Sequence, residues 1–571
     1  MRESGRVRSS IAGIRSRPTC EVLIIGGGIN GIAVFRDLAL NGIDVVLVER
    51  GDWASGASAA SSHMIHGGIR YLENGEFRLV RESVYERNAL LRLAPHYVRP
   101  LPTTIPIFST FAGLLSAPLR FVGLKLRGRR ERGALIIRIG LLIYDTFSRD
   151  GGRVPRHQFR GRRASRALLP ALRRDVKWTA TYYDASMHDP ERLALDVLID
   201  GVDAGDNARA SNYVRAVATD SGGATRLRDE VSGEEFSVAA RVVVNATGPW
   251  TDLTNLALGE PTQYMGGTKG SHIVLDNPEL LAACHGREIF FEFTDGRIVL
   301  IYPLKGRVLV GTSDLPHDMS EPIRCTDAEV DYFITLISHV FPTIAVQKSQ
   351  IVFRFSGVRP LPRHDAATTG QISRDYRVER ADRGPTTVLS VVGGKWTTFR
   401  ALGEQVSQRV LEMLGRERSI TTAGRLIGGA VGYPQNGRER EEWLRIRGAS
   451  VGRERAAQLL ERYGTSCEPI ITEIASTDDS PLVHAPEYSR REVQYLAETE
   501  QVVRLVDVVL RRTSLAFVGR VTSELLDELA DVVGESLDWT SEQRRTEADD
   551  ARLYLYEHHG IDLRQAVPHD E

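Results

Sequence analysis

The sequence predicts an α/β fold followed by a helical C-terminal domain, and three observations support this prediction. A short apolar run over 22–25 ends in glycines, and a helical pattern over 32–40 and a second apolar run over 43–48 follow it. Two more buried-strand patterns each lead into a turn that contains glycine, over 241–245 and 389–392. Beyond about residue 425 the chain is charged and amphipathic at helical spacing, over 439–462, 490–512 and 523–533. Strand, glycine turn, helix and strand form a βαβ unit, the element of a parallel sheet.

Chain length, composition and the positions of the cysteines limit the classes of protein to which this chain can belong. A chain of 571 residues is too long for one hydrophobic core, so we expect two or three domains. The composition is that of a globular protein, which excludes a disordered or collagen-like chain. The four cysteines are far apart and form no CxxC pair, so we expect a reducing compartment and neither a disulfide framework nor a metal site. Residues 1–19 are basic without an apolar stretch, and we expect a flexible leader.

Positive charge is concentrated in one part of the chain. Residues 120–174 contain 16 Lys and Arg against 3 Asp and Glu, although the net charge of the whole chain is −1. The preceding stretch 100–119 carries no charge, but its four prolines oppose a membrane-spanning helix, so we expect a buried strand and loop there. A basic amphipathic segment over 113–144 can lie on an anionic bilayer surface, and a solvated basic loop is the alternative. No nucleic-acid-binding motif accompanies the charge, so nucleic acid is not expected as a partner.

The first glycine turn has the spacing of a dinucleotide-binding motif, GxGxxG. Gly26 permits the tight turn, Gly28 lets the backbone approach a pyrophosphate, and Gly31 allows helix and strand to pack closely. The phosphates would lie at the helix N-terminus, where free N–H groups and the helix dipole favour anions. Glu49 closes the second strand, where its carboxylate can accept hydrogen bonds from an adenosine ribose. The motif predicts a Rossmann-type domain that binds a dinucleotide.

Two later turns favour FAD over NAD. The strand ending at 245–248 and the Gly393-Gly394-Lys395 turn before a helix are typical of flavin enzymes whose chain returns to one FAD three times. In that arrangement the late helix points its N-terminus at the flavin, and the helix dipole stabilises negative charge on the reduced ring. FAD is therefore the expected cofactor.

Taken together, these segments resemble the FAD-dependent glycerol-3-phosphate dehydrogenase/oxidase family. The resemblance covers roughly residues 20–415 and, more loosely, the helical tail. It rests on the glycine turn at 24–31 and on these segments: SSHMIHGGIRYL at 61–72, NATGPW at 245–250, KGSH at 269–272, SGVRPL at 356–361, SRDY at 373–376 and DVVLRRT at 507–513. Two residues depart from the family pattern, because His63 replaces the usual Lys and Trp396 the usual Leu.

The resemblance implies residues for each role. Those expected to bind FAD are Gly26, Gly28, Asn30, Gly31, Glu49, Ser61, Ser62, Gly67, Gly248, Gly394, Lys395 and Thr397. The substrate phosphate needs fixed cations, and Arg forks match its oxygens well. The expected substrate-binding residues are Arg70, Tyr71, Arg359, Arg374 and Lys395, and the expected catalytic residues are His66, Lys269 and Arg359.

His66 is the first candidate for the base that accepts the hydroxyl proton. Imidazole titrates near neutral pH and can take up a proton at cellular pH. A hydrogen bond from His66 to the cofactor or to a loop carbonyl is the alternative. Lys269 is the second candidate, as a base or as an electrostatic partner of the developing alkoxide. His272 is expected to support a loop.

The predicted fold is α/β, with a discontinuous FAD-binding domain, an inserted β-rich substrate domain and a helical C-terminal domain. The domains are predicted at 20–98, 190–262 and 355–415 for FAD, at 99–189 and 263–354 for the substrate or cap domain, and at 425–571 for the helices. A hairpin is expected over 298–302 and 308–311.

The resemblance implies oxidation of sn-glycerol 3-phosphate to dihydroxyacetone phosphate by hydride transfer to FAD. Electrons would pass to a quinone, from a cytoplasmic protein held peripherally at the inner face of the cell membrane. Oxygen as the acceptor, another polyol phosphate such as erythritol phosphate and, least favoured, a flavoprotein without catalysis are the alternatives. A homodimer is compatible with the sequence.

Overall fold

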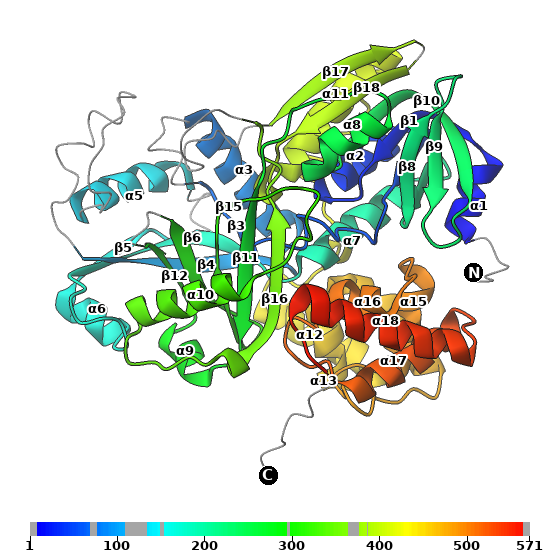
Figure 1. The fold of residues 1–571 in the computed structure, drawn as a ribbon. Coiled ribbons are helices and arrows are strands. Elements are labelled where there is room, and N and C mark those ends of the chain that lie inside the picture. Colours follow the sequence, from blue (N-terminus) through cyan, green and yellow to red (C-terminus); the bar gives the residue numbers. More distant parts are fainter. Residues whose placement is uncertain are drawn as a thin grey trace.

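The fold consists of two β-sheets and a C-terminal helical region. A computed structural model describes residues 8–68, 77–108, 134–148, 154–293, 297–363, 376–384 and 386–563. An eight-stranded and a ten-stranded sheet lie side by side (Figure 1). The last helices of the C-terminal region share a hydrophobic core with the ten-stranded sheet. This arrangement confirms the predicted fold class.

The eight-stranded sheet contains the strands predicted for the FAD-binding domain. Its order is β17–β18–β10–β1–β2–β7, with β8 and β9 continuing from β10. β1 pairs in parallel with β10 and β2, and β10 pairs in parallel with β18. Neighbouring parallel strands end at the same edge, so the turns after β1, β10 and β18 meet there. The bounds are β1 Thr19–Ile25, β2 Val45–Val48, β7 Ala208–Ser211, β8 Val214–Thr219, β9 Thr225–Asp229, β10 Glu235–Asn245, β17 Arg377–Arg383 and β18 Thr386–Val392.

Helices α2 (Ile29–Leu40), α7 (Pro190–Val202) and α11 (Phe399–Leu414) cover one face of this sheet (Figure 1). A Cβ atom added at Gly403 of α11 would lie 2.8 Å from the Cβ atom of Ala33 in α2. Only a residue without a side chain allows this approach, which sets the late helix directly against the first. The two helices therefore begin at the same edge of the sheet.

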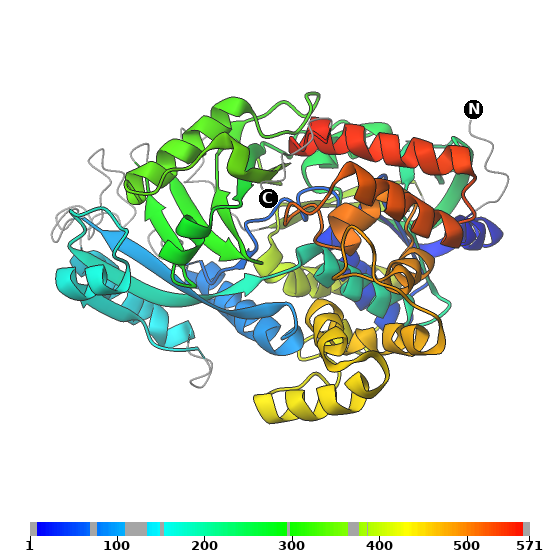
Figure 2. The same cartoon turned by 90° about the horizontal axis from the view of Figure 1, so that it is seen from below.

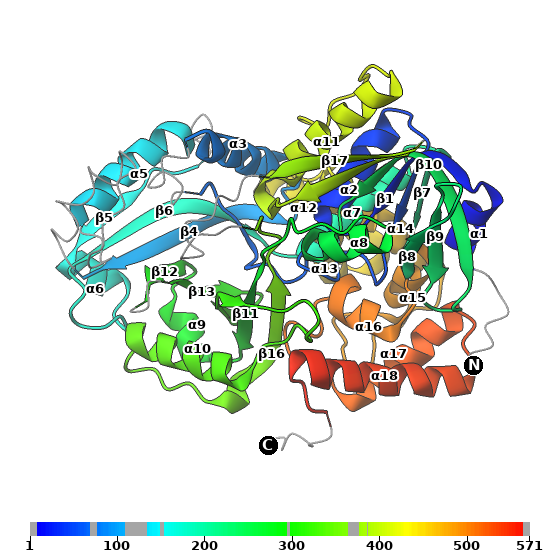
Figure 3. The same ribbon diagram turned by 45° about the horizontal axis from the view of Figure 1, so that its top comes forward.

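The ten-stranded sheet carries the expected hairpin, in which β13 (Ile298–Leu304) pairs antiparallel with β14 (Arg307–Gly311). The sheet order is β15–β11–β14–β13–β12–β4–β6–β3, with β16 beside β11 and β5 beside β6. Helices α3 and α5 lie on one side of β4 and β6, and α9 and α10 lie on the other (Figure 3). The remaining bounds are β3 Met64–Ile65, β4 Val98–Ile107, β5 Gln158–Gly161, β6 Trp178–Met187, β11 Thr268–Leu275, β12 Glu288–Glu292, β15 Leu315–Pro316, β16 Ile351–Val358, α3 Phe77–Leu93, α5 Ala134–Ser148, α6 Arg162–Leu168, α8 Thr251–Ala257, α9 Pro278–Ala283 and α10 Asp327–Val340.

The described residues beyond 425 form helices and loops, seen together in Figure 2. The segment predicted over 439–462 is two helices, because Gly452 interrupts it with a φ of 86°. The segment predicted over 490–512 ends in a π-helical turn over Val508–Arg512. The helices are α12 Gly437–Val451, α13 Arg453–Tyr463, α14 Glu468–Ser476, α15 Arg490–Thr499, α16 Leu505–Asp507, α17 Ser523–Ser536 and α18 Ser541–His559.

Three predicted features need correction or fall outside the structure. The leader is not flexible over its second half, because helix α1 (Ser9–Ser16) buries Ile11 and Ile14 in the core beside β7. The predicted domain boundary at 355 falls inside β16, which belongs to the ten-stranded sheet. The uncharged stretch is a strand over Val98–Ile107, as expected, and its remainder from residue 109 lies outside the described residues.

Candidate active site

Among Gly26, Gly28 and Gly31 of the glycine turn, only Gly28 has open space in front of it through which a ligand can approach. Gly26 has a φ of 112°, and a Cβ atom there would lie 2.7 Å from the carbonyl oxygen of Ala246. A Cβ atom at Gly31 would overlap the carbonyl oxygen of Gly26. At Gly28, by contrast, the nearest atom to such a Cβ is Ser58 Oγ at 3.3 Å. Gly26 and Gly31 are thus required by the packing of the chain, and Gly28 borders the space at the N-terminus of α2 where a pyrophosphate fits.

The Glu49 carboxylate faces the same turn. It accepts hydrogen bonds from the backbone N–H groups of Gly27 at 2.7 Å and Gly51 at 2.9 Å. Burial raises the pKa of Glu49, and these two hydrogen bonds oppose that shift. The predicted ribose acceptor therefore lies where the adenosine end of FAD would reach it.

A cavity of about 170 Å³ opens where the two sheets meet. Its wall contains Ser61, Ser62, His272, Arg359 and Lys395, together with the glycines at 270, 357, 393 and 394. Asn30 Oδ1 is buried nearby and has no hydrogen-bond partner within the described part of the chain. Gly394 has a φ of 98°, and a Cβ atom there would overlap the Asn30 amide. A glycine-lined wall and an unpaired buried oxygen fit a planar, polar group such as the flavin.

Hydrogen bonds hold both ends of the peptide bond between His66 and Gly67. Its carbonyl oxygen accepts a hydrogen bond from Thr397 Oγ1 at 3.3 Å, at the start of the late helix. The next N–H group, that of Gly67, donates to Asp184 Oδ1 at 2.9 Å. A side chain at Gly67 would overlap Tyr144 Oη. The structure thus brings His66 and Thr397 together, as predicted for two residues of one site.

Arg359 follows β16 and lies over Gly270, on the cavity wall. Its guanidinium donates to Asp314 Oδ1 at 2.8 Å and to Thr312 Oγ1 at 3.1 Å. The side chain is 22% exposed. These contacts fix the fork in one orientation, which suits recognition of an oxyanion.

Lys269 lies on the other face of the sheet from the cavity. Side chains alternate along β11, so Gly270 and His272 face the cavity while Lys269 faces α10. Its Nζ donates to Glu329 Oε2 at 2.8 Å and to the carbonyl oxygen of Arg324 at 2.7 Å. Burial opposes ionisation of Glu329, but hydrogen bonds from Lys269 and Ser313 lower its pKa to about 2. The geometry gives Lys269 a structural ion pair, and does not support the predicted role as a base.

His272 lines the cavity and also supports a loop, as expected, because it contacts Ser62 in the loop before β3. It is a residue of β11, its Nε2 lies 2.8 Å from Ser62 Oγ, and its Nδ1 is buried without a partner among the residues described. Burial, followed by the charge of Arg359, lowers the pKa of His272 to about 3, so the ring is neutral. The alternation along 268–275 was the signal that could have separated His272 from Lys269.

The two departures from the family pattern have distinct surroundings. His63 has a φ of 54°, and its Nδ1 lies 3.2 Å from the carbonyl oxygen of Met187, with the ring against Phe517. Trp396 Nε1 donates to the carbonyl oxygen of Ser58 at 2.9 Å. Trp396 therefore ties the late helix to the segment beside the glycine turn, and His63 packs against the C-terminal region.

The other predicted residues divide into two groups. Lys395 lines the cavity and donates from Nζ to Ser83 Oγ at 2.6 Å. Gly248 has a φ of 60° in the turn after β10. Arg70, Tyr71, Arg374 and the basic residues at 109–133 lie outside the described residues.

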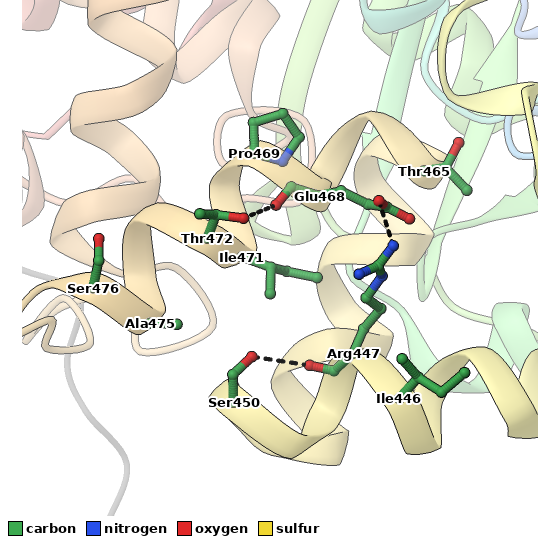
Figure 4. A pocket seen from close by; sticks show the side chains of 10 residues that line it. All are labelled: Ile446, Arg447, Ser450, Thr465, Glu468, Pro469, Ile471, Thr472, Ala475 and Ser476. Atoms are coloured by element: carbon green, nitrogen blue, oxygen red, sulfur yellow. Dashed lines mark hydrogen bonds and ion pairs between the residues drawn. The ribbon is translucent and has the colours of Figure 1, made fainter.

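A larger cavity, of about 700 Å³, lies between α12 and α14 (Figure 4). Arg447 and Glu468 form an ion pair across it at 2.6 Å. The hydroxyl groups of Ser450 and Thr472 donate to carbonyl oxygens of their own helices. The lining contains none of the predicted site residues, so this cavity is separate from the candidate active site.

Comparison with known proteins agrees with the predicted family, fold and cofactor. Residues 21–408 match the family described as FAD dependent oxidoreductase, and residues 386–544 match the C-terminal domain of alpha-glycerophosphate oxidase. The chain is 33% identical to the glycerol-3-phosphate dehydrogenase of Synechocystis sp., over 92% of this chain and 94% of the relative. It is 29% identical to the D-erythritol 1-phosphate dehydrogenase of Brucella abortus, over 87% and 94%.

A solved structure has the same fold. The glycerol-3-phosphate dehydrogenase from Bacillus halodurans, complexed with FAD, aligns with a TM-score of 0.75 and 22% identity over 97% of this chain and 98% of its own. The chain belongs to the FAD-dependent oxidoreductases and, within them, to the glycerol-3-phosphate dehydrogenase family. Its cofactor is FAD, as the glycine turn and the two later turns predict.

We predict that Gly28→Val abolishes FAD retention while the protein still folds. A Cβ atom at this position has only Ser58 Oγ near it in the protein, whereas a branched side chain blocks the approach of the pyrophosphate. Flavin absorbance and circular dichroism of the purified variant measure the two effects. Gly31→Val is the contrasting control and should impair folding itself. A Gly28→Val protein that stays yellow would contradict the placement of the pyrophosphate.

Proposed function

We propose that this protein oxidises sn-glycerol 3-phosphate to dihydroxyacetone phosphate and passes the electrons to a membrane quinone. The observation that carries the proposal is the cavity in which His272, Arg359 and Lys395 converge beside the start of the late helix. Both relatives are named for the oxidation of a polyol phosphate, which supports a substrate of this class. The more similar of the two is a glycerol-3-phosphate dehydrogenase, which supports the three-carbon substrate.

The phosphate binds to the cationic side of the cavity. Arg359 and Lys395 lie on its wall, and Arg70 and Arg374 are expected to complete the set. Arg359 is already paired with Asp314, so a dianionic phosphate needs these further cations for charge balance. Because the fork is held by Asp314 and Thr312, little orientational freedom is lost when the phosphate binds.

The alcohol loses one hydride and one proton to become a ketone. When bound, FAD supplies the two-electron oxidant that takes up the hydride. His66 accepts the hydroxyl proton, since the peptide bond between His66 and Gly67 is fixed by Thr397 and Asp184 and an imidazole can act as a general base. Neutral His272, held by Ser62, lines the cavity and helps to orient the hydroxyl group.

An apolar helix face supports a membrane-linked acceptor. Helix α5 buries Leu141 and Tyr144 and exposes Leu135, Ile139 and Leu142, which are 42%, 49% and 54% exposed and share one face at i, i+4 and i+7. Within the described ranges, no helix combines the length and apolarity needed to cross a bilayer. An apolar face beside the basic sequence at 120–132 suits shallow insertion into an anionic surface.

We predict that His66→Ala slows reduction of the flavin by glycerol 3-phosphate by about 10²–10⁴-fold. The Michaelis constant should change little, because the base acts on the reacting proton. Anaerobic stopped-flow bleaching measures the rate, and His484→Ala, at an exposed histidine of the C-terminal region, is the control. A variant that keeps FAD and the full rate would show that another group or water takes the proton.

Arg359→Gln is expected to weaken substrate affinity by about 10- to 150-fold, the effect of losing one charge-assisted contact. The concentration of glycerol 3-phosphate that gives half-maximal bleaching measures this. Arg354→Gln, in strand β16 just before Arg359 but paired with Asp327, should have no such effect. Affinity unchanged by Arg359→Gln would leave the phosphate to Arg70, Arg374 and Lys395. A panel including erythritol 1-phosphate and unphosphorylated glycerol defines the polyol.

Replacing Leu135, Ile139 and Leu142 together by serine should reduce binding to anionic vesicles and reduction of a quinone analogue. Reduction of the flavin by substrate should persist, because these side chains point away from the cavity. Co-sedimentation measures binding, and replacement of Leu253 and Leu256, equally exposed on α8, is the matched control. If the α5 variant binds vesicles like the wild type and reduced enzyme reoxidises fully in air, the oxidase alternative is favoured.

A further inference from the structure

A buried ion pair joins the C-terminal helices to the FAD-binding sheet. The Arg512 guanidinium forms two hydrogen bonds with the Asp52 carboxylate, at 2.6 Å to Oδ2 and 2.9 Å to Oδ1. Arg511 Nε donates to the same Oδ2. The side chains of Asp52 and Arg512 are both 0% exposed. Burial opposes the charge on Asp52, but the two guanidinium groups hold its pKa well below the usual range.

Asp52 belongs to the loop that encloses the glycine turn. Three residues earlier, Glu49 accepts from the N–H groups of Gly27 and Gly51. The next residue, Trp53, lies so close to Gly27 that a Cβ atom there would be 2.5 Å from its ring. The N–H group of Ala54 then donates to the carbonyl oxygen of Gly27 at 2.9 Å. The backbone on both sides of Asp52 thus shapes the turn, while the Asp52 side chain points into the C-terminal region.

The surrounding charges balance. Asp507 accepts from Arg511 at 2.8 Å, and Glu500 pairs with Arg192 at 2.5 Å. With Asp52 and Arg512, three carboxylates and three guanidinium groups are therefore buried in one cluster. The cluster also contains one neutral side chain, Asn212, whose Nδ2 donates to Asp52 Oδ1 at 2.9 Å. Removing one cation leaves three buried carboxylates with only two guanidinium groups, so the loop that carries Asp52 must shift or take in water.

The π-helical turn explains how two consecutive arginines reach one carboxylate. Adjacent residues of an α-helix point about 100° apart and do not share a partner. Here residues 508–512 form a π-helical turn, and Arg511 and Arg512 both donate to Asp52. π-helical turns are rare and are often found at functional sites. The DVVLRRT segment therefore makes a specific contact with Asp52, in the loop that follows β2 of the eight-stranded sheet.

We propose that Arg512, assisted by Arg511, is a positioning residue for FAD: it holds Asp52 and thereby fixes the 49–54 loop that orients Glu49 and the glycine turn. The C-terminal helical region thus completes a cofactor site that it does not touch. The inference rests on the placement of the FAD pyrophosphate at Gly28 and extends it to a residue of another domain.

The test compares FAD affinity in the full chain carrying Arg512→Gln, Arg512→Lys or Arg490→Gln. Arg490 is the control, because its Nη2 donates to both carboxylate oxygens of Glu535 in the same helical region but at the surface. FAD affinity is measured by titrating each apoprotein with FAD and following flavin fluorescence. Arg512→Gln should bind FAD about 10- to 100-fold more weakly than the wild type, and Arg490→Gln should bind it with wild-type affinity. Arg512→Lys should fall between them, since Lys keeps the charge but loses the fork.

A second measurement separates positioning from general destabilisation. Hydrogen exchange of the 49–54 peptide in the apoprotein should accelerate in Arg512→Gln and not in Arg490→Gln, while the core strands β1 and β10 keep their protection. Wild-type FAD affinity or unchanged exchange of the loop in Arg512→Gln overturns the proposal. If Arg512→Gln behaves like the wild type while Gly28→Val loses FAD, the placement of the pyrophosphate at Gly28 stands. Only the positioning role of Arg512 is then rejected.

If Arg512→Gln does not yield folded protein, the double variant Asp52→Asn with Arg512→Gln replaces the ion pair by two amides. This variant removes the buried unpaired charge that would prevent folding. Because the amides do not restore the bidentate contact, it should still release FAD faster than the wild type. A double variant with wild-type affinity would likewise overturn the proposal.

Discussion

The parallel pairing of β1, β10 and β18 is the constraint on which the rest of the site depends. Ile24 lies opposite Val244, and Val244 lies opposite Leu389, so three distant segments end at one edge of the sheet. The turns that follow then touch, as the approach of Gly26 to Ala246 shows. Without this register, the helix N-terminus of α2 and the late helix would not face one cofactor.

Local pattern was sufficient for the βαβ unit, the 298–311 hairpin and the helical tail, because each depends on short-range periodicity. It was insufficient for α1, whose two buried isoleucines stand among arginines that suggest a solvated leader. It also missed the break at Gly452, where one glycine at positive φ ends a continuous amphipathic pattern. Of the site, the glycine turn, His66 and Arg359 were proposed from motifs, whereas the position of Lys269 away from the cavity was missed because the face of β11 depends on its sheet partners.

Buried charge explains why the remaining residues could not be predicted. Lys269 with Glu329, and Arg512 with Asp52, are each inside the protein and each paired. In a sequence such residues resemble the solvated Lys, Arg, Asp and Glu that cover most surfaces. Only the structure shows that removing one partner would leave an uncompensated charge in a low-dielectric interior, where the penalty is large. The sites where sequence analysis is weakest are therefore those where single substitutions have strong effects.

Asp184 connects the segment after His66 with the proposed membrane face. Its Oδ1 accepts from the N–H group of Gly67 at 2.9 Å and from Tyr144 Oη at 2.7 Å, and Arg87 lies 3.2 Å away. Gly67 follows His66, and Tyr144 lies on the buried side of α5, whose outer side carries the exposed leucines. One buried carboxylate on β6 thus fixes both the segment that holds the proposed base and the helix that carries the apolar face. The proposed geometry of the reaction and the proposed position of the membrane surface therefore both depend on this strand.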